Sequence, residues 1–103
     1  MDKRELNNEL ESLKDHQIYK HIAIIQTINH DENEKSIYHD DYRIQYTSTL
    51  YGLTNILIDI YHITYNQYFK IIENKIDQII KNNKRDNTTT IIKIIKSSNI
   101  KEI

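Results

Sequence analysis

Apolar residues recur at helical spacing in the first quarter of the chain. At about 100° per residue they form one broad stripe on a helix. Asp2 is positioned to cap this helix, with Glu5 three residues later completing a capping box. The pattern predicts a helix over residues 3–29, and a short strand over residues 22–25 is the weaker alternative. The positions on the predicted face include Leu6, Leu10, Leu13, Ile24 and Ile28.

The next stretch, residues 30–46, breaks this periodicity. Its first part is polar and acidic, as in a loop. Tyr42, Ile44 and Tyr46 alternate with polar residues, which suits a short strand, although a helix fits residues 37–45 nearly as well. Since no second strand is evident, a strand here would leave its backbone groups unpaired. We therefore expect residues 35–46 to be helical or irregular.

The strongest helical periodicity lies between residues 47 and 81. One stripe advances in alternating steps of four and three, as in coiled coils and long packed bundles. A straight helix of this length would span about 50 Å, too long for a domain whose radius of gyration should be about 13 Å. We expect the helix to bend near residues 64–67 or to extend into a second copy. The stripe consists of Ile58, His62, Tyr65, Phe69, Ile72, Ile76 and Ile79.

A polar segment, Asn82–Asn87, is expected to end the long helix. Beyond it, four isoleucines between residues 91 and 95 fall at spacings that fill one helix face. The density of β-branched residues suits a strand as well. The spacing favours a helix over residues 88–97, with the strand as the alternative.

These segments together predict an all-α fold. We expect a single domain over residues 1–103, a small helical bundle of three to four helices with one long central helix. Two apolar stripes on that helix exceed what a small monomer can cover, and large apolar patches are rarely left exposed. We therefore predict a homo-oligomer, most simply a dimer. Its expected interface is Ile58, Tyr65, Phe69, Ile72, Ile76 and Ile79.

Composition weakens several apparent signals. Ile, Asn, Lys and Tyr supply 52 of the 103 residues, while Val and Pro are absent and Ala and Gly occur once each. An AT-rich coding sequence explains this bias without selection for function. The chain has no Cys, hence no disulfide or thiolate metal site. It has neither a long apolar run nor an apolar N-terminal leader, so we expect a cytoplasmic protein.

Charge is unevenly distributed along the chain. Residues 1–69 carry a net charge of −5 and residues 70–103 a net charge of +4. A basic third of this kind is a candidate nucleic-acid surface, although only three arginines are present in the whole chain. Residues 88–103 also suit a short amphipathic helix on a membrane surface. The candidate phosphate contacts are Lys81, Lys84, Arg85, Lys93 and Lys96.

Catalytic and metal motifs are lacking. Asp59 and His62 resemble half of a carboxylate-bridged metal motif, but the second half is missing. His30 and His39 flank an acidic loop and form a second candidate pair. A single Gly excludes the common glycine-rich phosphate loops, and no serine lies in a recognisable nucleophile motif. We predict no catalytic activity, no cofactor and no metal.

By elimination, we predict a small non-enzymatic protein-interaction module. The wide apolar faces and the long central helix support this interpretation. The composition is typical of accessory or inhibitor proteins of phages, viruses and mobile elements that bind a larger protein. The alternative is a sequence-independent nucleic-acid-binding protein that uses the basic C-terminal third.

Overall fold

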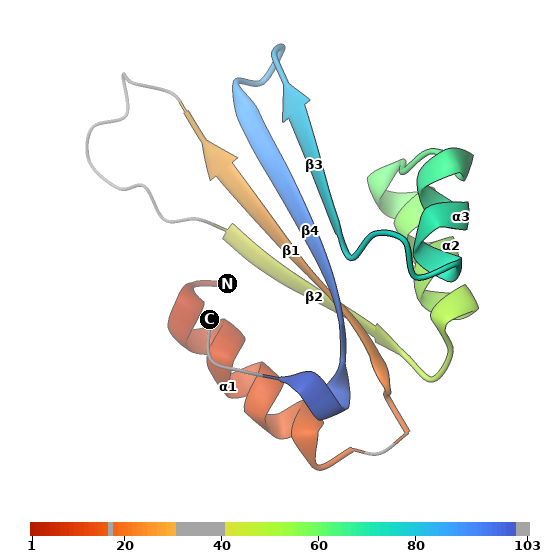
Figure 1. The fold of residues 1–103 in the computed structure, drawn as a ribbon. Coiled ribbons are helices and arrows are strands. Elements are labelled where there is room, and N and C mark those ends of the chain that lie inside the picture. The colour runs from red at the N-terminus through yellow and green to blue at the C-terminus, as the bar shows by residue number, and fades with distance from the viewer. Residues whose placement is uncertain (17, 31–40, 101–103) are drawn as a thin grey trace.

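Three helices flank a four-stranded antiparallel sheet in the computed structural model, which describes residues 1–16, 18–30 and 41–100. The strand order is β2-β1-β4-β3, so β1 and β4 lie at the centre. Helix α1 lies on one side of the sheet and the α2–α3 pair on the other (Figure 1). The elements are α1 (Lys3–Lys14), β1 (His21–Asn29), β2 (Asp41–Thr47), α2 (Leu50–Tyr61), α3 (Tyr65–Ile72), β3 (Gln78–Asn83), β4 (Thr88–Lys96) and the 3-10 turn η1 (Ser97–Asn99).

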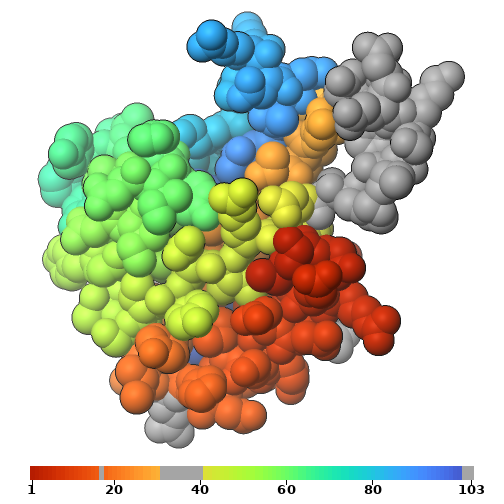
Figure 2. Space-filling view, turned by 180° about the vertical axis from the view of Figure 1, so that it is seen from behind, coloured from red at the N-terminus to blue at the C-terminus, as the bar shows by residue number. Residues whose placement is uncertain are grey.

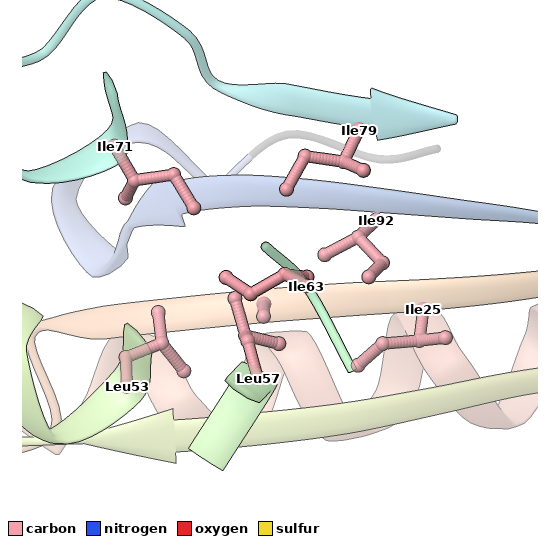
Figure 3. Close-up of a cluster of buried hydrophobic side chains, with 8 residues drawn as sticks. Ile25, Leu53, Leu57, Ile63, Ile71, Ile79 and Ile92 are labelled. Atoms are coloured by element: carbon pink, nitrogen blue, oxygen red, sulfur yellow. The ribbon is translucent and has the colours of Figure 1, made fainter. Parts of the chain in front are cut away.

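Strand β1 is buried on both faces, because successive side chains of a strand point to opposite sides. Ala23 and Ile25 face one apolar cluster and Ile22 and Ile24 face another. The first cluster, here called the α2–α3 core (Figure 3), contains Ala23, Ile25, Leu53, Leu57, Ile63, Ile71, Ile79 and Ile92. The second, the α1 core, contains Leu6, Leu10, Leu13, Ile22, Ile24 and Tyr42.

The predicted all-α helical bundle is therefore wrong, since strands make up 35% of the described residues. A helix is present at the N-terminus, and the Asp2 side chain caps it by accepting a hydrogen bond from the Glu5 N–H at 2.8 Å. The predicted helix over residues 3–29 is wrong beyond Lys14, because residues 21–29 form β1. A strand buried on both faces is a continuous apolar run without the alternation of a half-buried strand.

The long helix predicted over residues 47–81 is also wrong, and its first interruption lies at its middle. His62 ends α2 in the left-handed conformation, with φ of 56°. Thr64 then begins α3, and its side chain and that of Gln67 form a reciprocal capping box. Left-handed helix ends usually carry Gly or Asn, so a histidine in this position gave no warning of the break.

A second interruption follows α3. Asn74 has φ of 58°, and the chain then enters β3. Ile76 therefore lies in the connection and Ile79 in a strand, so the predicted helical stripe does not exist as one surface. The match of strand residues to the helical spacing was fortuitous.

The helix predicted over residues 88–97 and the expectation for residues 35–46 fail for a related reason. Residues 88–97 form β4 and its end rather than a helix, and residues 41–47 form β2; residues 35–40 of the uncertain segment lie outside the described part. β2 pairs with β1, and β4 pairs with both β1 and β3. The partner of the strand at residues 41–47 is β1. It was missed because β1 lies within residues 3–29, which were predicted to be a helix.

None of the described helices is long and apolar enough to cross a membrane.

The α2–α3 core predicts a clear contrast between two residues of α2. Leu57 is completely buried, whereas Ile60 is 53% exposed. Leu57→Ala should lower the free energy of unfolding by about 2–5 kcal/mol, because it removes core contacts and leaves a cavity. Ile60→Ala should cost about 1 kcal/mol or less, since little apolar area is lost. Urea denaturation measures both, and equal losses would contradict the assigned core.

Candidate functional site: the outer face of α3

The outer face of α3 carries two aromatic side chains one helical turn apart. Tyr65 is 73% exposed and Phe69 is 57% exposed. Ile72, three residues beyond Phe69, is half-buried and lies on the same side. We call these three residues the α3 stripe. Figure 2 shows α2 and α3, in green, along one flank of the molecule.

The stripe is held by a short, well-anchored helix. Ile71 is the fully buried residue of α3 and fixes it in the α2–α3 core, with Tyr68 packed partly against the same core. The rings of Tyr68 and Phe69 meet edge to face, with centroids 5.5 Å apart. The capping box fixes the first turn. The aromatic side chains therefore project from a rigid element.

Charged groups lie beside the stripe. Lys70 and Glu73 are exposed at the end of α3. The Glu73 carboxylate forms an ion pair with Lys75, at 2.6 Å from its Nζ. Both charge signs are thus present next to the apolar stripe, as at the polar rim of a binding surface.

The structure keeps half of the predicted oligomer interface together. Tyr65, Phe69 and Ile72 form the α3 stripe. Ile58 and Ile76 instead pack, partly buried, against the α2–α3 core, and Ile79 lies inside it.

The predicted nucleic-acid contacts are dispersed. The Lys81 ammonium donates hydrogen bonds to the carbonyl oxygens of Tyr61 at 2.6 Å and His62 at 3.3 Å, so it caps the C-terminus of α2. Lys84 and Arg85 lie in the turn between β3 and β4.

The other two predicted contacts lie along β4. Lys93 and Lys96 point to opposite faces of the sheet, because they are an odd number of positions apart. Lys96 lies about 26 Å from Thr88, where β4 leaves the turn, at about 3.3 Å per residue. The five basic residues therefore do not share one surface.

The histidine candidates show no complete set of metal ligands within the described residues. Within residues 1–16, 18–30 and 41–100, no group of three or more His, Asp or Glu side chains could hold a metal ion. Asp59 and His62 gain no third ligand. The His30 ring contacts the Thr89 hydroxyl at 2.8 Å across the sheet, and His39 lies outside the described residues.

One feature of the surface had no counterpart among the sequence predictions. A cleft of about 380 Å³ lies where β1 begins and β4 ends, and its lining includes His21 and Lys96. Lys20 and His21 are adjacent in the sequence, but Lys96 joins them only through strand pairing. The sequence had marked Lys96 as a candidate phosphate contact, but it gave no sign that Lys20 and His21 lie beside it.

The contacts of Lys81 predict that its ammonium group contributes to the free energy of unfolding, whereas that of the exposed Lys84 does not. Lys81→Met keeps the aliphatic chain but removes the ammonium from the end of α2. It should lower the free energy of unfolding by about 1–2 kcal/mol, because two charge-assisted bonds to helix carbonyls are lost. Lys84→Met, in the exposed turn, should change it by about 0.5 kcal/mol or less. Chemical denaturation gives both values, and no difference between the variants would refute the capping role.

Comparisons of this chain with protein-family models, with curated proteins and with solved structures find no match.

Proposed function

We propose that this protein is a non-enzymatic protein-interaction module and that the α3 stripe is its binding surface. The supporting observation is the exposure of Tyr65 and Phe69, side by side on a helix anchored from its other side. Single exposed apolar residues are ordinary, but a contiguous stripe marks an interaction site. Aromatic side chains are also enriched in protein interfaces and bring large contact area at low entropic cost.

The partner we propose for the stripe is a second copy of the chain. In a dimer with two-fold symmetry the same surface of both copies forms the interface. If one residue contacts a second residue of the other copy, the reverse contact is also present. Antiparallel packing of two α3 helices places Phe69 against Tyr65 of the second copy. Lys70 and Glu73 lie beside the stripe, so each copy presents both charge signs at the rim of the interface. The stripe can thus pack against its own copy through apolar contact, with charges of both signs at the rim.

The proposed interface is small, because α3 has only eight residues. Interfaces below about 1,200 Å² of total buried area are usually weak or transient. We therefore expect a dimer in rapid exchange with the monomer. Larger proteins that present an apolar groove are the other class of partner that such a stripe fits, and this class would be left if the chain stayed monomeric in the experiment below.

Light scattering and sedimentation over a concentration series test the dimer. The wild-type chain should approach a dimer at about 100 µM, well above a micromolar dissociation constant. The double variant Tyr65→Ser and Phe69→Ser should remain a monomer over the same range. Its circular dichroism and unfolding midpoint should stay close to wild type, because both side chains are mostly exposed.

The matched control is Tyr51→Ser. Tyr51 is 60% exposed on α2 and lies outside the α3 stripe, so this variant should dimerise like the wild type. A wild-type chain that stays monomeric throughout would rule out the second copy as partner. Equal loss of dimer in the control would show that the α3 stripe is not the interface.

A further inference from the structure

The end of the sheet opposite the β3–β4 turn carries a cleft with an apolar floor and a polar rim. β1 begins at His21 and β4 ends at Lys96, and these residues are direct partners in the antiparallel ladder. The cleft lies between them, the first turn of α2 and the connection from α3 to β3. Its floor is formed by Leu50, Ile71, Ile76 and Ile94, and polar rim residues are His21, Asn74, Asp77, Lys96 and Asn99.

A second depression continues from this cleft, since both share His21 and Lys96. It adds Lys20, Ser97 and Ser98 to the lining. The backbone fixes this corner, because the Ser97 N–H donates a 2.9 Å hydrogen bond to the Lys20 carbonyl oxygen. Three basic side chains therefore converge at one corner of the sheet, held by strand pairing.

These basic groups lack a neutralising partner in the part of the chain that the structure describes. Neither Lys20 nor Lys96 forms an ion pair there. His21 is half-buried, and both lysines are near enough for their charges to act on it. Its pKa is lowered first by desolvation and then by the positive charges of Lys96 and Lys20. Asp77 is the acidic residue on the rim of the cleft.

We propose that this corner binds a small organic phosphate, with the phosphate group among Lys20, His21 and Lys96 and the apolar part of the ligand on the cleft floor. A phosphate dianion supplies three acceptor oxygens for donors that approach from several directions. The cleft volume of about 380 Å³ falls within the range of small-molecule sites. This site is separate from the α3 stripe, since α3 contributes to it only the inward-facing Ile71.

The affinity of this site for phosphate should depend on pH, and the protonation of His21 determines the direction of the change. In the free protein the folded-state pKa of His21 lies below its ordinary value, so folding favours the neutral ring. A bound phosphate reverses this effect, because it stabilises the imidazolium. The pKa of His21 should therefore rise on binding, and affinity for the phosphate dianion should increase as the pH falls from 8 to about 6.5, above the second pKa of a phosphate monoester at about 6.

The test is an NMR titration of the His21 ring in the full chain with phenyl phosphate, inorganic phosphate and benzoate. Phenyl phosphate should raise the His21 pKa and bind more tightly than inorganic phosphate, because only it occupies the apolar floor. It should also bind more tightly than benzoate, which carries a single charge. Lys96→Gln should weaken phenyl phosphate binding about tenfold or more, the usual effect of losing a charge-assisted bond.

Lys93→Gln is the matched control, because Lys93 lies on the same strand but on the opposite face of the sheet. This variant should bind phenyl phosphate like the wild type. No shift of His21 with any phosphate, or equal weakening by both variants, would overturn the site. Benzoate binding as tight as phenyl phosphate would overturn the phosphate assignment. Equal affinity for inorganic and phenyl phosphate would overturn the role of the apolar floor.

Discussion

Burial of β1 on both faces is the constraint on which the rest of this structure depends. Its four consecutive buried residues, 22–25, require an apolar layer on each side of the sheet. Helix α1 supplies one layer and the α2–α3 pair supplies the other. Strands β2 and β4 satisfy the backbone groups of β1 along both of its edges. No buried side-chain nitrogen or oxygen in the described part lacks a hydrogen-bond partner. Packing the two helical layers onto the sheet therefore leaves no such atom with an unpaired desolvation penalty.

The short elements of this fold end without glycine. His62, Asn74 and Asn87 take the left-handed conformation at three consecutive chain reversals. Asn tolerates this conformation because its side chain bonds locally, whereas His62 is held by contacts around the end of α2. Its carbonyl oxygen and that of Tyr61 accept hydrogen bonds from Lys81 on β3. A distant strand residue thus stabilises the helix end that a glycine would normally form.

These reversals also determine which side chains reach the surface. A continuous helix would have carried Tyr65, Phe69 and Ile76 along one seam. The break at Asn74 confines the exposed part of this seam to α3, and Ile76 instead lines the cleft. Helix α3 contributes to both surfaces from opposite sides, with Ile71 facing inward and the α3 stripe outward. The position of this helix in the core therefore controls both proposed sites.

The sequence by itself determined the N-terminal helix start, because Asp2, Glu5 and the leucines that follow interact within a few residues of one another. It also identified Tyr65, Phe69 and Ile72 as one helical face, since that spacing is local. Tertiary structure decided the strands. An isoleucine run buried on both faces has no period of two, and the partners of β1 and β4 are remote in the chain. The pairing of His21 with Lys96, and with it the basic corner, exists only because strand register joins the two ends of the sequence.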